Sequence, residues 1–205
     1  MSSVLDILGD QFDDSTLRGL GRQISADEDT TGRAVAAALP VLLAALSRNA
    51  ENPAGATDLL GALERDHDGS LLDDLGGFLG QGGATGGEAA EILGHVLGQD
   101  RGRVEQGLGK AAGLDAQKIG RLLMVLAPIV MAALGRAKRR DRLDPGGLSD
   151  VLARDRQRAD RAGAGGLASI LLDQNRDGSV MDDVARIGSG VLGSLFKRQS
   201  VAREP

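Results

Sequence analysis

The sequence LLMVLAPIVMAAL occupies residues 122–134 and is one of the two longest uninterrupted apolar runs in the chain. Its 13 residues are too few to cross a membrane, which takes about 20 apolar residues, so the run predicts a buried core helix. A similar run, AVAAALPVLLAAL, occupies residues 34–46. Both runs are apolar nearly all round, which is typical of helices buried on every side. Each contains one proline, Pro40 or Pro128, and a kink is expected there because proline removes a backbone donor.

The two runs belong to longer segments that match at a constant offset. Residues 19–48 align with residues 107–136 without a gap, and 11 of the 30 pairs are identical. Identical Ala and Leu carry little information in such a composition. The informative identities are Gly19/Gly107, Gly21/Gly109, Gly32/Gly120, Arg33/Arg121, Pro40/Pro128 and Arg48/Arg136. The sequence therefore predicts two tandem copies of one helical unit.

The expected fold class is all-α, because no segment shows the two-residue alternation of a strand. Each copy is expected to contain a proline-kinked, buried central helix and an acidic helix-loop-helix. The copies are assigned to residues 1–80 and 88–196, separated by a glycine-rich linker at 81–87 and followed by a disordered tail at 197–205. The linker belongs to a glycine-rich stretch, 76–87, that is expected to be flexible. The expected helices cover about 3–12, 14–24, 31–49, 54–63, 88–98, 101–112, 116–140 and 145–161.

The composition excludes several kinds of site. The chain has no cysteine, and therefore neither a disulfide nor a thiolate metal site. A net charge of -5 and a pI of about 5.1 argue against a nucleic-acid partner. The N-terminal residues show no basic and apolar pattern of a signal peptide, so a cytoplasmic location is expected.

Two acidic loops, 64–74 and 173–183, hold the candidate metal ligands. In each, oxygen-bearing side chains alternate ahead of an Asp-Gly pair, and two aspartates follow. Alternating oxygens around a glycine turn are the pattern of an EF-hand loop, which binds Ca²⁺ or Mg²⁺. The candidate ligands are Glu64, Asp66, Asp68, Asp73, Asp74, Asp173, Asn175, Asp177, Asp182 and Asp183. The pattern predicts Ca²⁺ as the bound ion, with Mg²⁺ as the alternative.

The loops depart from an EF-hand at the position that closes the ion's shell. An EF-hand has a bidentate Glu at position 12, whereas this chain has Leu75 or Val184 there. The loops are therefore shortened. An alternative without any metal is a turn followed by a helix cap. In that reading, Ser70 or Ser179 caps the next helix, with an acid three residues later.

Two basic runs lie at 136–142 and 154–161. We interpret both as solvated helix ends, where cations favour the helix dipole. An alternative is that the first run meets anionic lipid at a membrane surface.

Several segments of the sequence resemble those of a known protein family. These are the alanine-rich helix 36–46, the segment LGAL at 60–63, the loop DHDGSLLDDL at 66–75, LGHVLG at 93–98 and APIVMAALG at 127–135. They resemble the bacterial YidB-like proteins of unknown function, catalogued as domain of unknown function nine hundred thirty-seven, over roughly 4–196. The resemblance implies an all-helical bacterial protein without an assigned activity, and it transfers no catalytic residue.

The sequence therefore predicts a noncatalytic binding or assembly protein rather than an enzyme. Its abundant small apolar residues suit close helix contacts between chains, so a homo-oligomer or a protein partner is expected. No nucleic acid is expected, and association with a membrane surface is the alternative.

Overall fold

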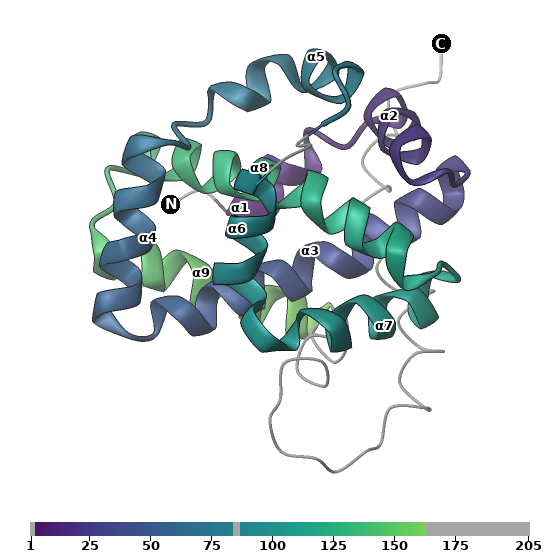
Figure 1. Cartoon of the computed structure of the whole chain (residues 1–205). Helices are drawn as coiled ribbons and strands as arrows, with labels where there is room; N and C mark the ends of the chain where they lie inside the picture. Colours follow the sequence, from purple (N-terminus) through teal and green to yellow (C-terminus); the bar gives the residue numbers. More distant parts are fainter. Residues whose placement is uncertain (1–2, 84–86, 163–205) are drawn as a thin grey trace.

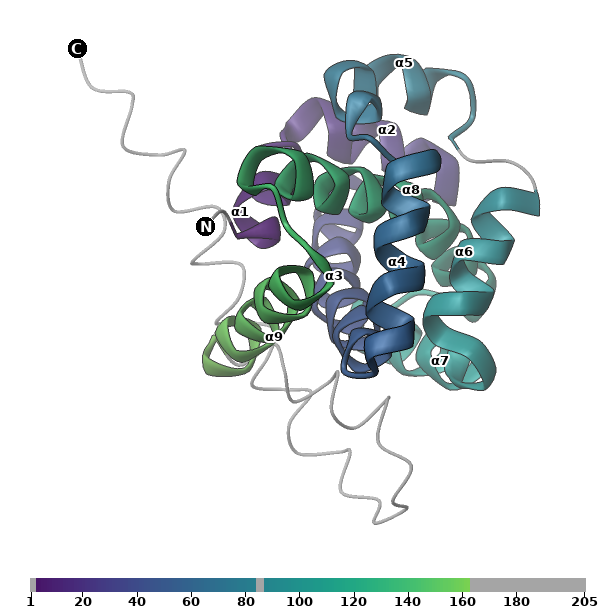
Figure 2. The ribbon, with the colours of Figure 1, turned by 90° about the vertical axis from the view of Figure 1, so that its left-hand side faces the viewer.

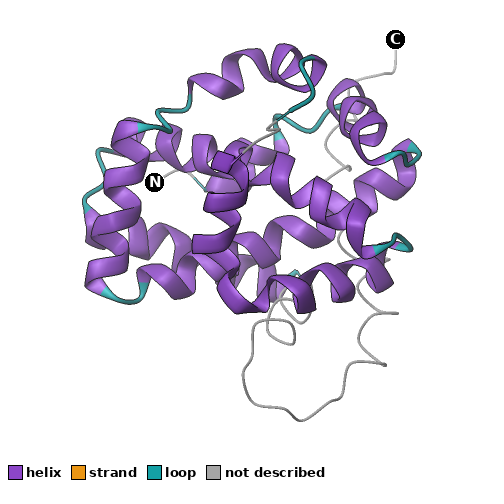
Figure 3. Cartoon of the chain, viewed as in Figure 1, coloured by secondary structure: helices purple, strands orange, loops and turns teal. Residues whose placement is uncertain are grey.

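The computed structural model describes residues 3–83 and 87–162. Within these residues the chain forms α-helices and short 3-10 helices, and it has no strand (Figure 3). The all-α class expected from the sequence is therefore confirmed.

Two long helices, α3 (Glu28–Ala50) and α8 (Ala116–Asp141), form the centre of the fold (Figure 1). Their apolar runs are buried along nearly their whole length, as expected for helices surrounded by other helices. Pro40 and Pro128 each lie inside one of these helices, which continues on both sides of the proline. A kink at either proline stays a prediction.

Shorter helices surround these two. They are α1 (Val4–Gly9), α2 (Asp14–Ile24), α4 (Pro53–Arg65), α5 (Leu75–Gly80), α6 (Gly87–Leu97), α7 (Arg101–Ala112) and α9 (Pro145–Arg161), with 3-10 helices at Ser70–Asp74 and Gly98–Asp100. The bounds agree closely with the expected ranges for most helices. The first helix, however, ends at Gly9 rather than near residue 12.

Helix α5 corrects the expectation of a flexible connector from residue 76 onward. The Asp74 carboxylate accepts a hydrogen bond from the Gly77 N–H at 2.8 Å and caps the helix. Leu75 and Leu79 are buried. Leu79 Cδ1 packs 3.0 Å from where a Cβ atom would stand on Gly19 of α2. The cap and the two buried leucines offset the poor helix propensity of the glycines.

Most helices begin where a short polar side chain accepts a hydrogen bond from the first turn. The capping residues of α2, α3, α4, α8 and α9 are Asp13, Asp27, Asn52, Asp115 and Asp144. Each satisfies a backbone N–H that has no partner within the helix. Because such caps are local in sequence, they explain why the helix starts could be predicted.

Helices from the two expected copies pack into one core. Helix α3 contacts α7 and α9, whereas α8 contacts α1, α2 and α4. Helix α9 lies along α3 rather than along α8, which precedes it in the chain (Figure 2). A single cluster of buried apolar residues joins these helices. The helices assigned to the two expected copies are therefore interleaved, and the tandem repeat itself stays a prediction.

Among the described residues, α3 and α8 are long and apolar enough to cross a membrane by length and composition alone. In each, 83% of the apolar window is buried inside the fold. A buried core helix of a globular protein has the same properties, so this burial favours the core-helix interpretation.

Candidate functional site

The first acidic loop, 64–74, lies against the last turns of α8. Gly69 has a φ of +92°, and a Cβ atom there would stand 3.0 Å from the Arg136 backbone nitrogen. On the α8 side, a Cβ atom on Gly135 would stand 1.7 Å from the His67 carbonyl oxygen. The loop can approach this closely because glycine occupies both positions.

Carboxylates of the loop pair with cations on α8. The pairs are Glu64 with Lys138 at 2.7 Å, Asp68 with Arg139 at 3.2 Å, and Asp73 with Arg136. Arg136 is also attached to the loop backbone, since its guanidinium donates to the Gly69 carbonyl oxygen at 3.0 Å. Exposed ion pairs are screened by water and salt, so we expect the glycine contact to contribute more to docking than the charges.

The pKa of the Asp68 carboxyl lies below its ordinary value. Hydrogen bonds from the Ser70 hydroxyl and backbone N–H are the main cause, and the Arg139 charge adds to them. Asp68 therefore stays ionised to lower pH than a free aspartate and stabilises the turn at Gly69.

The carboxylates of this loop are not arranged around a common centre. Asp66 pairs with its neighbour Arg65 at 3.9 Å, and Asp74 caps α5. In the part of the chain that the structure describes, no group of three or more His, Asp or Glu side chains could hold a metal ion. The geometry of Glu64, Asp66, Asp68, Asp73 and Asp74 thus gives no support to the EF-hand interpretation, and cation binding by this loop stays a prediction.

The second predicted site lies outside the described residues. Its members are Asp173, Asn175, Asp177, Asp182 and Asp183. The structure therefore says nothing of their arrangement, and the expected tail at 197–205 also lies outside the described part.

The capping-box alternative is wrong in its details for the first loop. Gly69, not Ser70, precedes the 3-10 helix at Ser70–Asp74, and no side chain caps that helix. The cap comes from Asp74, at the start of α5. The reason is that the chain passes through the short 3-10 helix before α5 begins, which moves the first α-helical turn four residues along.

The basic runs are engaged in contacts that the solvated-end interpretation does not include. On α8, Arg136, Lys138 and Arg139 hold the acidic loop. On α9, Arg158 pairs with Asp6 at 2.9 Å and Arg156 with Glu51 at 3.1 Å. The acidic loop and the run at 136–139 carry opposite charges, and this complementarity in the sequence could have indicated that the loop contacts α8.

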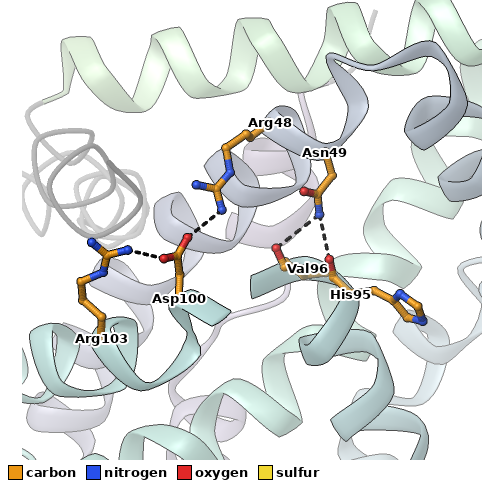
Figure 4. A network of polar contacts seen from close by, with 6 residues as sticks. All are labelled: Arg48, Asn49, His95, Val96, Asp100 and Arg103. Carbon is orange, nitrogen blue, oxygen red and sulfur yellow. Dashed lines mark hydrogen bonds and ion pairs between the residues drawn. The ribbon is translucent and has the colours of Figure 1, made fainter. Parts of the chain in front are cut away.

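Asp100 is a buried carboxylate that forms an ion-pair network with two partly exposed arginines near the end of α3 (Figure 4). Its carboxylate lies between Arg48 of α3, at 3.0 Å, and Arg103 of α7. Burial by itself raises the pKa of the Asp100 carboxyl, but the hydrogen bonds and charges of the two arginines outweigh burial and leave the pKa below 3.8. Next to it, the Asn49 amide donates to the carbonyl oxygens of His95 and Val96 at the end of α6.

Asp155 is a buried carboxylate on α9 that caps a helix distant in sequence. It accepts hydrogen bonds from the Ser3 hydroxyl and from the Val4 N–H, both at 2.7 Å, at the start of α1. Burial raises the pKa of Asp155 above 3.8 despite these hydrogen bonds. Sequence reasoning missed this residue because it lies within a basic run, and its partner is 151 positions away.

A groove of about 770 Å³ opens where the α2–α3 turn meets the α7–α8 turn. The two turns are built alike. Ser25 and Gly113 both adopt left-handed backbone conformations, with φ of 54° and 72°. A Cβ atom on Gly21 or Gly109 would stand 2.7 or 2.6 Å from a carbonyl oxygen of its own turn. This close contact explains why both aligned segments have glycine at this position, as Gly21 and Gly109.

The two turns contact each other directly at the groove. The Lys118 ammonium on α8 donates to the Ser25 carbonyl oxygen at 2.9 Å. Arg18 and Arg22 of α2 and Asp27 and Glu28 at the start of α3 complete the charged lining. The groove therefore combines charged side chains with small apolar ones. Nothing in the sequence distinguished the charged residues of the groove from other charged surface residues, so sequence reasoning missed them.

Comparison with known proteins connects this fold to a family. The model of a bacterial protein family of unknown function (DUF937) matches residues 6–137. The match includes α3 and most of α8, and it is shorter than the resemblance over 4–196 that the sequence indicated. No curated protein and no solved structure gives a significant match. Since the matched residues make up more than half of the chain, this protein belongs to the DUF937 family of bacterial proteins of unknown function.

Proposed function

We propose that this chain is a noncatalytic binding or assembly protein that holds a protein partner in the groove between the α2–α3 and α7–α8 turns. The observation that carries the proposal is the groove itself, about 770 Å³ in volume and lined by charged and small apolar residues. Both turns are fixed by helix caps, so the groove is formed before a partner binds. Preformed sites of this kind avoid the entropy cost of ordering a surface on binding.

The noncatalytic part of the proposal is supported by how the buried carboxylates are used. Asp100 is held between Arg48 and Arg103, and Asp155 caps α1. Neither lines the groove. A cytoplasmic location and the absence of a nucleic-acid partner remain parts of the proposal. The acidic composition supports only the second of these.

A second copy of the chain is the first partner to test. Light scattering over a wide range of protein concentration should show a mass that rises with concentration. Ala26→Trp, which fills the groove, should abolish this rise, whereas Ala54→Trp, exposed on α4, should not. If the Ala26 and Ala54 variants associate equally, assembly through the groove is excluded. A monomer mass at every concentration excludes self-assembly and leaves a different protein as the partner.

Ca²⁺ or Mg²⁺ binding is a second candidate, favoured by the Asp-x-Asn-x-Asp-Gly pattern that starts at Asp173. In the first loop a cation would have to displace Arg136, Lys138 and Arg139 from their carboxylates. We therefore expect calorimetric Ca²⁺ binding to be lost in Asp177→Ala and kept in Asp68→Ala. Absence of binding and of thermal stabilisation at millimolar Ca²⁺ and Mg²⁺ would exclude an ion-dependent role.

Membrane-surface association is supported less, because cations of the run at 136–142 are already paired with the acidic loop. Flotation with anionic liposomes tests this alternative directly. Recovery of the protein with the liposomes would favour the membrane over a protein partner.

A further inference from the structure

We propose that the groove recognises a carboxylate side chain of an acidic peptide segment, held by Arg22 and Lys118. This inference rests on the proposed function, and it specifies the chemistry of the partner. The inference depends on which charged side chains of the groove already form hydrogen bonds or ion pairs within the protein and which have donors left for a ligand.

The acidic groups of the groove are engaged within the protein. The Asp27 carboxylate accepts a hydrogen bond from the Thr30 N–H at 2.8 Å and caps α3. Glu28 lies 3.6 Å from the Arg18 guanidinium, which also donates to the Asp14 carbonyl oxygen at 3.0 Å. These three charged side chains therefore have partners within the protein.

Two cations in the groove, Arg22 and Lys118, have no carboxylate partner among the residues that the structure describes. Arg22 is exposed and makes no hydrogen bond or ion pair with any residue that the structure describes. Lys118 has one hydrogen bond, to the Ser25 carbonyl oxygen, although an ammonium group carries three donors. The groups left to contact a ligand are therefore cationic, and the ligand group that they fit is an anion.

The charge of the lining favours a carboxylate over a phosphate. Three cations, Arg18, Arg22 and Lys118, stand beside two acids, Asp27 and Glu28, so the net charge of the lining is +1. A singly charged carboxylate neutralises this charge. A phosphate monoester, with nearly two charges at neutral pH, overcompensates it and meets repulsion from the two acids.

The shape of the groove favours a peptide over a free small acid. Its volume of about 770 Å³ is much larger than one carboxylate needs. Gly21, Ala26, Gly113 and Leu114 give the lining an apolar part next to the charged one. A peptide segment can place its backbone and small side chains on this apolar part while one acidic side chain reaches the cations.

The test is fluorescence anisotropy of labelled octapeptides with the full chain at low salt. One peptide alternates glutamate with glycine, and the matched one replaces every glutamate by glutamine. We expect the glutamate peptide to bind and the glutamine peptide to bind at least tenfold more weakly. Arg22→Gln should weaken binding of the glutamate peptide about tenfold, and Lys118→Met should also weaken it. Lys110→Met, exposed on α7 and outside the groove, should leave it unchanged.

Three results would overturn the proposal: equal binding of the two peptides, unchanged binding in Arg22→Gln, or no binding at all. Competition with free anions distinguishes the carboxylate from the phosphate. Inorganic phosphate that displaces the peptide at lower concentration than acetate contradicts the charge argument. The light-scattering experiment with Ala26→Trp stays separate, since assembly through the groove without acidic-peptide binding keeps the proposed function and excludes only this inference.

Discussion

The carbonyl oxygen of His67 lies 1.7 Å from the place that a Cβ atom would take on Gly135. The first acidic loop and α8 thus share a contact that only glycine at 135 allows. In an open helix position, replacing glycine by alanine stabilises by about 1 kcal/mol. In Gly135→Ala the added methyl group must push the loop away. We expect a net loss of about 1–3 kcal/mol in the free energy of unfolding, measured by urea denaturation.

Gly94 of α6 supplies the matched control, because nothing lies within 4 Å of a Cβ atom added there. Gly94→Ala should raise the unfolding free energy by up to about 1 kcal/mol. Equal stabilisation in both variants would show that the loop does not rest on Gly135.

Asp100→Asn should destabilise the fold by about 1 kcal/mol, because it replaces the charged acceptor that Arg48 and Arg103 share by a neutral one, while both partly exposed arginines keep contact with water. The pKa of Asp100 is lowered in the folded state, so its contribution is present above pH 3.8 and is lost as pH falls through the folded pKa. The difference in unfolding free energy between wild type and variant should therefore shrink on acidification below pH 3.8. A double-mutant cycle with Arg48→Met measures the coupling, and additive effects would contradict the pair.

The helix ends were predictable because their signals are local. Asp13, Asp115 and Asp144 each precede a helix and cap it. The observed starts of these helices match the expected ones, since a cap and the first turn are only a few residues apart. The burial of the two apolar runs was equally readable, because a helix without a polar face has no side to turn to water.

The contacts of the acidic loop could not be predicted from the spacing of its carboxylates. Alternating oxygens fix which residues carry carboxylates, but the direction of those side chains depends on what lies beside the loop. Here that neighbour is α8, whose Arg136 reaches the Gly69 carbonyl across 67 positions. Asp155 and its α1 partners are separated by still more sequence. Such pairs depend on how helices distant in sequence pack together, and the periodicity of apolar residues does not reveal this packing.

Asp155→Asn should show the opposite pH dependence to Asp100→Asn. The folded pKa of Asp155 is raised above 3.8 by burial, so the folded state binds a proton more tightly than the unfolded one. Wild type should therefore lose stability relative to the variant as pH rises from 3.8 through the folded pKa. Asparagine keeps an acceptor for the Val4 N–H, and its amide can donate to the Ser3 hydroxyl. Urea titrations at several pH values measure the difference.

Asp155→Ala separates the cap from the charge. It removes both acceptors at the start of α1, so it should be about 1–2 kcal/mol less stable than Asp155→Asn, by the same amount at every pH because neither variant titrates at this position. A constant difference between wild type and Asp155→Asn across the acidic range would contradict the raised pKa.

Arg136→Gln should destabilise more than Asp73→Asn, although the two residues form one ion pair. The Asp73 side chain is 72% exposed, so its loss removes only a screened surface charge, worth less than about 1 kcal/mol. Arg136 is 31% exposed and also donates to the Gly69 carbonyl oxygen at 3.0 Å. Its replacement therefore leaves a backbone acceptor of the turn without this donor.

High salt should reduce the cost of Asp73→Asn and leave most of the cost of Arg136→Gln, because salt screens the charges but not the hydrogen bond to the backbone. Equal costs for the two variants at low salt would mean that the ion pair alone holds the loop.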